Sequence, residues 1–546
     1  MHTYNVGMLL AAALLLACQR DAELPTAAPD QDLVPHQAMA EARKQRKAQL
    51  ERLSGMPMLM MADRLRVTEI RGKSIKTKQT PKRGGRGKRL GDVPVADHPT
   101  ADENEPAVAT NPKAKKRLVA GYHFITDIAR CHARRSSDGG RTWSAPVVMP
   151  QLTGESECSD PVVAYSPDGS RVFYAYMDLK FFIFDSTVTT DFDILVSYSD
   201  DDGATWVGPF IALQGVQGVF DYDKPWIGTP DDASSYVYVT ATRFDAAAPF
   251  ACSIVFTRSV NKGSSYGPPQ TLDASPGACG EGASPVVQGS RPAGGKRGSV
   301  LVAWYHSGTD GWLTGSFHIR TRHSADYGSS FGPVVDAVTD ASETPFWKGP
   351  FNCYERWWGS MFPDVELDPK GGGHIAYTHD PAAGNETAEV GDIRYVRSAG
   401  APHTSWSAPR TVNDDGTVSA QGYVAIDIKS EGTGQSAKPH ATWEDHRLPL
   451  EAAVGAECPF FPDVENLEYD IFYSTRRGST WSPNVRVSDR SSRSDFIFNG
   501  DYIDLTTTTG GLFTIWTDRR DKSSIMDLED DVWGSRTHRV QVAANP

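Results

Sequence analysis

Pairs of short apolar segments recur along residues 100–540. In each pair a short strand runs into a turn, and an alternating strand that ends in polar residues follows it. Examples are DPVVAYSPDGS followed by RVFYAYMD, and ASPVVQGS followed by SVLVAWYHSG. Alternation with a period of two residues indicates half-buried β-strands, and the Gly-, Pro- and Asp-rich segments between them indicate turns. Seven such pairs occur, so the pattern predicts an all-β chain built from a repeated unit.

A second phrase, S-x-D-x-G-x-T-W in its clearest form, follows six of these pairs. The clear copies start at Ser136, Ser199 and Ser324, the weaker ones at Ser259 and Ser474, and a worn, longer one at Ser398. We interpret the phrase as a turn in which the Asp accepts N–H bonds, the Gly permits a positive φ, and the aromatic residue packs between neighbouring sheets. Its Asp residues are therefore expected to be structural and not catalytic.

Each repeat carries two further strands, one that leads into the phrase and one that follows it, as in DIFYSTR and WSPNVRVS. Four antiparallel strands per repeat of about 55–80 residues are typical of a β-propeller. The last repeat stops after its third strand, DDVWGSR, so one strand is missing. We expect residues 91–97, GDVPVAD, to supply it and to close the ring by pairing the two ends of the chain. The sequence predicts seven blades; six is the alternative, if the last repeat only caps the ring.

Residues 1–18 read as a targeting signal. The apolar run from Val6 to Ala17 has twelve residues, too few to span a bilayer, and it ends at Cys18. This resembles a bacterial lipoprotein signal peptide in which Cys18 becomes acylated, although no Lys or Arg precedes the run. The alternative is a plain secretory signal. Both interpretations predict export, to the outer membrane as a lipoprotein or otherwise to the periplasm or the medium.

Residues 19–90 differ from the rest in charge. Residues 19–95 hold 17 Lys and Arg against 9 Asp and Glu, net +8, whereas residues 96–546 hold 38 against 59, net −21. We interpret residues 19–90 as a disordered basic tether, with a short helix as an option at residues 40–54. It either contacts an anionic envelope polymer or lipid head groups, or is a solvated spacer.

The composition suggests many turns and excludes several classes of protein. Apolar residues make up 39% and charged residues 23% of the chain, with 49 Gly and 36 Pro. These values exclude a polytopic membrane protein, a coiled coil and a wholly disordered chain. The overall net charge of −13 argues against nucleic acid as the main partner. Membrane contact is expected only through the N-terminal lipid.

Export makes the six remaining cysteines candidates for disulfides. Two pairs have the same separation of 27 residues and occupy equivalent places in two repeats, and the third pair is the remainder. The predicted bridges are Cys131–Cys158, Cys252–Cys279 and Cys353–Cys458. The alternative is six free buried thiols. No Cys/His spacing indicates zinc and no EF-hand spacing supports a structural calcium ion, so no cofactor is predicted.

The S-x-D-x-G-x-T-W phrase is the Asp box, and Asp boxes in a propeller resemble the sialidase superfamily over residues 100–540, about four fifths of the chain. Sialidases are six-bladed and use an arginine triad, a Tyr/Glu nucleophile pair and an Asp acid/base. Their first arginine lies in a Phe-Arg-Ile-Pro phrase. The matching residues here are Asn104-Glu105-Pro106-Ala107, with an acid in place of the arginine. Seven-bladed Asp-box propellers also occur in xyloglucan-cleaving hydrolases and photosystem assembly factors, so the resemblance implies a fold more than an activity.

We expect a ligand at the axial mouth, where first strands begin and second strands end. Candidate residues at the first-strand starts are Glu105, Asp160, Asp223, Lys224, Glu281, Arg356, Asp501 and Tyr502. Those at the second-strand ends are His123, Asp178, Arg243, His306, His379, Glu444, Asp445, Arg447, Asp518, Arg519 and Arg520. Glycoside cleavage needs a proton donor and a nucleophile or base, usually two carboxylates.

The resemblance implies roles for four of these residues. Tyr502 with Glu444 is the nucleophile pair of a sialidase-like mechanism, and Asp160 or Asp223 is its acid/base. The alternative is that such charges form ion pairs between blades.

Arginines flanked by tryptophan suit a carboxylated sugar, by bidentate pairing and ring stacking. The predicted substrate-binding residues are Arg356, Arg447, Arg519, Trp357 and Trp443. The sequence thus predicts a sialidase-like propeller that binds or hydrolyses extracellular glycans, an exo-α-sialidase-like glycoside hydrolase if it is catalytic. The alternative is a non-catalytic adhesion or assembly scaffold in the envelope.

Overall fold

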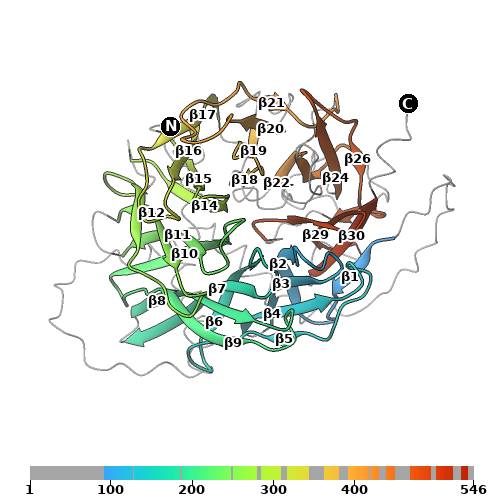
Figure 1. Cartoon of the computed structure of the whole chain (residues 1–546). Helices are drawn as coiled ribbons and strands as arrows, with labels where there is room; N and C mark the ends of the chain where they lie inside the picture. The colour runs from blue at the N-terminus through green and yellow to red at the C-terminus, as the bar shows by residue number, and fades with distance from the viewer. Residues whose placement is uncertain are drawn as a thin grey trace, which may run out of the picture.

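A computed structural model describes residues 91–538, except 127, 185–186, 247–249, 280–283, 309–315, 344–361, 380–390, 417–418, 420, 429–437, 449–467, 494–499 and 521–529. The described residues form seven antiparallel sheets and no helix. The sheets follow one another around a central axis in chain order (Figure 1). This confirms the predicted seven-bladed β-propeller. No helix in the described part of the chain is long and apolar enough to cross a membrane.

The first four blades each contain four consecutive strands, the innermost first. Blade 1 is β2 (Asp102–Thr110), β3 (Leu118–Ile125), β4 (Ala129–Ser136) and β5 (Val147–Val148). Blade 2 is β6 (Glu157–Tyr165), β7 (Val172–Phe184), β8 (Thr187–Ser199) and β9 (Val207–Leu213). Blade 3 is β10 (Phe220–Gly228), β11 (Val237–Asp245), β12 (Cys252–Ser259) and β13 (Gln270–Ala274). Blade 4 is β14 (Val287–Gly294), β15 (Val300–His306), β16 (Ser316–Ser324) and β17 (Val335–Glu343).

The last three blades keep this order, with additions in blade 6 and a strand borrowed from the start of the chain in blade 7. Blade 5 is β18 (Asp364–Leu367), β19 (Gly373–His379), β20 (Asp392–Arg397) and β21 (Arg410–Thr411). Blade 6 is β22 (Gln421–Asp427), β23 (His440–Asp445), β24 (Glu468–Arg477) and β25 (Thr480–Trp481), with β26 (Val485–Arg486) and β27 (Ser492–Arg493) also paired to β24. Blade 7 is β28 (Asp504–Thr508), β29 (Gly511–Asp518), β30 (Asp531–His538) and β1 (Val93–Ala96).

The ring closes as the sequence predicts. Strand β1 pairs with β30, and Val93 lies opposite Gly534; in Figure 1 the blue strand β1 lies beside the red strand β30. The Arg520 guanidinium strengthens the closure by pairing with Asp92 and Asp489, each at 2.7 Å. The six-bladed alternative is therefore wrong: the borrowed strand completes a seventh blade and covers the free edge of β30.

The hydrophobic core is divided among clusters that neighbouring blades share. One cluster joins Phe173 and Ile194 of blade 2 to Val239 of blade 3, and another joins Phe317 of blade 4 to Tyr377 of blade 5. Each sheet buries both faces against its neighbours, so a blade lacks a complete core of its own.

The repeated S-x-D-x-G-x-T-W turns join adjacent blades. In the first copy the Asp138 carboxylate accepts bonds from the backbone N–H groups of Arg141 and Thr142, at 2.9 and 3.0 Å. Gly140 of this turn has φ +84°, and a Cβ there would lie 2.4 Å from the Phe513 ring of blade 7. The glycine is required both for the backbone conformation and for the close approach of the next blade.

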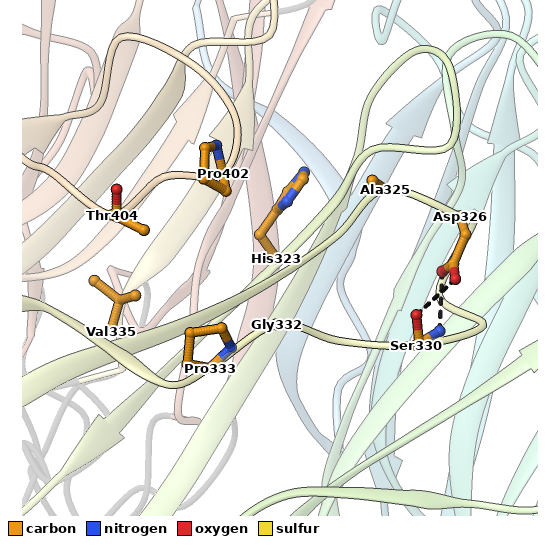
Figure 2. Close-up of a pocket in the computed structure, with 9 residues that line it drawn as sticks. All are labelled: His323, Ala325, Asp326, Ser330, Gly332, Pro333, Val335, Pro402 and Thr404. Carbon is orange, nitrogen blue, oxygen red and sulfur yellow. Dashed lines mark hydrogen bonds between the residues drawn. The ribbon is translucent and has the colours of Figure 1, made fainter.

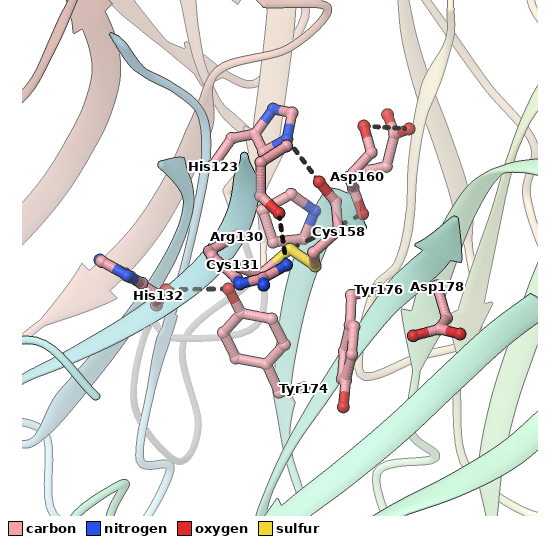
Figure 3. Close-up of a disulfide and its surroundings, with 12 residues drawn as sticks. His123, Arg130, Cys131, His132, Cys158, Asp160, Tyr174, Tyr176 and Asp178 are labelled. Carbon is pink, nitrogen blue, oxygen red and sulfur yellow. Dashed lines mark hydrogen bonds between the residues drawn. A yellow bond between two sulfur atoms is a disulfide. The ribbon is translucent and has the colours of Figure 1, made fainter. Parts of the chain in front are cut away.

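Two of the three predicted disulfides are confirmed. Cys131–Cys158 joins β4 of blade 1 to β6 of blade 2, and Cys252 on β12 is bonded to Cys279 in the connection to blade 4. Figure 3 shows the first bridge. Cys353, Cys458 and the predicted lipidation site Cys18 lie outside the described residues.

Candidate functional site

A repeated irregularity in the innermost strands directs side chains toward the axis. In β2, β6 and β10 the register shifts at an X-Pro step, and the residue before the proline has φ of +51°. These residues are Glu105, Asp160 and Lys224. Two residues that oppose one on the partner strand form a β-bulge, which bends the strand and re-aims a side chain. Blades 4 and 6 have the same shift, with Gly289 and Tyr423 at positive φ.

Lys224 lies at the centre of the resulting group. Its ammonium bonds Asp160 of blade 2 and Asp501 of blade 7, and its Nζ is 3.2 Å from Oε1 of Glu105 of blade 1. The side chains of all four residues are 0–6% exposed. We call Glu105, Asp160, Asp223, Lys224 and Asp501 the axial cluster; it gathers residues from four blades.

The surrounding residues hold the axial cluster in place. The Gln288 amide donates to Oδ2 of Asp223 at 2.8 Å. Nδ1 of His123 lies 3.8 Å from Oε2 of Glu105. The other ring nitrogen of His123 is 2.6 Å from the carbonyl oxygen of Cys158, so the first disulfide borders the cluster (Figure 3).

Burial and charge crowding alter proton affinities in the axial cluster. Burial, followed by the neighbouring Asp160 carboxylate, raises the pKa of Glu105 well above its ordinary value. Burial likewise raises the pKa of Asp223 to about 7, although the Lys224 ammonium opposes this. The surrounding carboxylates overcome the effect of burial on Lys224 and raise its pKa, so it remains charged. A protonated carboxyl beside an ionised one is the arrangement that general acid–base chemistry uses.

The axial cluster already contains a cation. Carboxylate oxygens of Glu105, Asp160 and Asp501 lie within 4.8 Å of one another, an oxygen set that suits a hard metal ion. The Lys224 ammonium contacts all three carboxylates, so in this chain it supplies the positive charge there.

Of the residues predicted to be catalytic, Asp160, Asp223 and Tyr502 come together at the axis. The Tyr502 hydroxyl donates to the carbonyl oxygen of Pro161 at 2.9 Å, and its ring packs edge-on against Trp226. Burial raises the pKa of Tyr502 well above its ordinary value. Glu444 is buried on β23 of blade 6, where it lies opposite Gly422 and Ile471.

Three of the predicted substrate-binding residues are described by the structure: Arg447, Arg519 and Trp443. Each is bonded to a carboxylate of its own blade. Arg447 pairs with Asp445 at 2.7 Å, and the same carboxylate accepts the indole N–H of Trp443, which is fully buried. Trp516, Asp518 and Arg520 repeat this W-x-D-x-R contact in blade 7. A repeated contact of this kind indicates a structural role for the motif.

Arg519 is also buried, and it pairs with Asp530 at 2.6 Å. Arg356, Trp357 and Glu281 lie outside the described residues.

Sequence reasoning placed Glu105, Lys224 and Asp501 at the mouth but gave them no role. The available signal was the X-Pro step at equivalent places in three repeats, Glu105-Pro106, Asp160-Pro161 and Lys224-Pro225. The central position of Lys224 depends on contacts between blades, which that signal does not contain.

A pocket of about 350 Å³ lies away from the axial cluster, beside the Asp326 turn between blades 4 and 5 (Figure 2). His323, Pro333, Val335 and Pro402 line it, mostly with apolar surface. Asp326 is the one carboxylate among the described residues that line this pocket, and it is bonded to Ser330 of its own turn. The pocket therefore offers no carboxylate pair for glycoside chemistry.

No protein-family model matches the chain, and no curated protein sequence is similar to it. Solved structures with some similarity include the GH93 α-L-arabinofuranosidase of Fusarium graminearum in complex with arabinobiose, with a TM-score of 0.44, 13% identity, and coverage of 84% of this chain and 100% of that one. A PL25 ulvan lyase has a TM-score of 0.47, 10% identity and coverage of 83% and 100%. The NanB sialidase of Streptococcus pneumoniae has a TM-score of 0.38, 10% identity and coverage of 83% and 70%. At these scores the matches assign no function to this chain.

Proposed function

We propose that the protein is an exported propeller that binds or hydrolyses extracellular glycans, with the axial cluster as its reaction centre. One observation carries the proposal: the carboxyl groups of Glu105, Asp160 and Asp501, from three blades, contact the ammonium of Lys224 from a fourth, and Asp223 interacts electrostatically with them. Bulges in successive innermost strands aim the groups there, at backbone conformations that are costly for residues other than glycine. Such strain at a cluster of ionisable groups favours a functional site over a structural one.

The chemistry that suits this group is glycoside hydrolysis by two carboxyl groups. Asp223, with its pKa raised to about 7, is the proton donor to the leaving oxygen. Asp160, which contacts the Lys224 ammonium, is the partner that acts as nucleophile or activates water. Tyr502 lies beside them and orients the bulge through its bond to the carbonyl oxygen of Pro161.

A non-catalytic scaffold is the second candidate, and the burial of the axial cluster favours it. The side chains of Glu105 and Asp501 are 1% and 0% exposed, and Lys224 neutralises part of their charge, as in an ion-pair network that joins blades. Such a network stabilises the ring without chemistry.

Turnover of a broad panel of fluorogenic glycosides distinguishes the two candidates. We expect activity that falls at least about 100-fold in Asp160→Asn and Asp223→Asn, as is usual when a general acid or base is removed. Asp200→Asn is the matched control, because Asp200 is an exposed carboxylate paired with Arg171 on the outer surface. Tyr502→Phe removes the bond to the carbonyl oxygen of Pro161, so reduced activity in this variant would agree with its orienting role. Absence of turnover across the panel would reject the enzyme, and a glycan array would then separate a lectin from a protein scaffold.

We also propose that the chain is anchored through a lipid on Cys18, with residues 19–90 as the tether between membrane and propeller. The apolar run that ends at Cys18 supports this. Radiolabelled fatty acid should label the wild-type protein and not Cys18→Ala, which should leave the membrane fraction. Equal labelling of both proteins, or labelling of neither, would contradict the lipid anchor.

Release of the anchored protein by high salt after cleavage within the tether would indicate contact with an anionic envelope polymer.

A further inference from the structure

The axial cluster offers hydrogen-bond acceptors and negative charge. Glu105, Asp160 and Asp501 contact the single ammonium of Lys224, and the adjacent Asp223 interacts electrostatically with it. After burial, the charges of Asp160 and Asp501 are among the causes that raise the pKa of Asp223. The one ammonium of Lys224 contacts three carboxyl groups, those of Glu105, Asp160 and Asp501, so it compensates their charge only in part and the local potential remains negative.

Two acceptors of this site lack a hydrogen bond within the described part of the chain. They are Oε2 of Glu105 and Oε1 of Gln288, and both residues are 1% exposed. Nδ1 of His123 lies 3.8 Å from the Glu105 oxygen, beyond hydrogen-bond range. An unsatisfied buried acceptor costs about 1–3 kcal/mol, so a ligand that donates hydrogen bonds would relieve both. A ligand that brings further acceptors would not.

The described arginines near the mouth are already neutralised. Arg447 pairs with Asp445, Arg519 with Asp530, and Arg291 with Asp364. Recruiting any of them for an anionic ligand would leave a buried carboxylate without its partner, which costs several kcal/mol. The binding of a carboxylated sugar, which the sequence predicts for Arg356, Arg447 and Arg519, is thus disfavoured by the pairs that Arg447 and Arg519 form.

We propose that the axial cluster selects glycans that present hydrogen-bond donors and positive charge, so that amino sugars bind in preference to their N-acetylated counterparts and acidic sugars are rejected. This inference rests on the glycan-binding function proposed above and names its substrate class. An ammonium group donates to the unsatisfied acceptors and is attracted by the residual charge. A sugar carboxylate would compete with three carboxyl groups for the one ammonium of Lys224 and would be repelled by them.

The experiment compares three oligosaccharides of equal length, made of glucosamine, N-acetylglucosamine or glucuronate. Calorimetric titration of the mature full-length protein at pH 6, where the amino sugar is charged, should give about tenfold tighter binding of the glucosamine oligomer than of the acetylated one. No binding of the glucuronate oligomer is expected. High salt should reduce the tenfold ratio, because it screens charge.

Two variants connect this preference to the axial cluster. Asp501→Asn removes one carboxylate and should bring the ratio close to one, whereas Asp200→Asn, an exposed outer carboxylate, should leave it unchanged. Tighter binding of glucuronate, or equal binding of the amino and acetylated oligomers, would overturn the inference while the glycan-binding function stood. Failure of all three oligomers and of a full glycan array would reject the proposed function, and the inference with it.

Discussion

Removing the axial ammonium is the most direct perturbation of this fold. Lys224→Met keeps a flexible apolar stem of similar length and deletes the charge that contacts Glu105, Asp160 and Asp501. Breaking a buried ion pair by removing one partner costs about 3–5 kcal/mol, because the remaining charge is buried without compensation. With three carboxylates left, we expect a loss of at least about 4 kcal/mol at pH 8.

The loss should depend on pH. Without Lys224, the buried carboxylates bind protons more tightly in the folded than in the unfolded protein. Their folded pKa values then lie above the unfolded ones, and stability falls as pH rises through the interval between them. At pH 5 the carboxylates of the variant take up protons and the penalty shrinks to lost packing, about 1 kcal/mol.

Differential scanning calorimetry at pH 5 and pH 8 measures both effects. Because the unfolding entropy is about 2.1 cal/mol/K per residue, about 4 kcal/mol in a propeller of this size lowers Tm by roughly 4–5 °C. Lys180→Met is the control, since Lys180 contacts Asp191 and Asp193 at 2.7 Å in a less buried place and should lose less. Equal Tm deficits of Lys224→Met at the two pH values would refute the reasoning and assign the loss to packing.

Three further predictions concern stability. Burial raises the pKa of Glu103 to about 8, above its unfolded value, so this carboxyl group lowers stability as pH rises from about 4.5 to 8. Glu103→Gln should therefore match the wild-type Tm at pH 5 and exceed it at pH 8. A lower Tm of the variant at both pH values would contradict this prediction. Gly140→Ala should lower the free energy of unfolding in urea by more than about 3 kcal/mol, and Gly510→Ala by only about 1–2 kcal/mol. Both glycines have a positive φ, but only Gly140 lies against a ring, that of Phe513. Equal losses in the two variants would show that the clash with the ring is relieved. Replacing Cys252 and Cys279 by alanine frees a 27-residue loop and should lower the free energy of unfolding by about 3–4 kcal/mol. A urea midpoint equal to that of the wild type under oxidising conditions would exclude the bridge.

The sequence was sufficient for the architecture because a propeller is a local repeat. Strand alternation recurs in every blade and the turn phrase in six of the seven, so each unit was recognisable from neighbouring residues alone. Closure by residues 91–97 followed from counting strands, since an open ring would leave β30 exposed at its edge. The equal spacing of two cysteine pairs predicted their bridges for the same reason.

The candidate site was predictable in position and not in chemistry. First strands are innermost, so their starting residues lie at the axis, as expected for Asp160, Asp223 and Tyr502. Arg447 and Trp443 have the composition of a sugar site, but the structure uses them in a W-x-D-x-R contact within blade 6. Composition alone does not distinguish an arginine that binds a ligand from one that is paired with a carboxylate.

The number of blades, the closing strand, two disulfides and the ring of residues that faces the axis were predictable from the sequence, because each depends on short-range periodicity. Which of those residues meet depends on contacts between blades, and these appear only in the folded ring. The Tyr502 hydroxyl bonds a carbonyl 341 residues away, and the Lys224 ammonium joins carboxylates of three other blades. Such contacts arise when the ring closes and burial forces each charge to find a partner, and no local pattern records that choice.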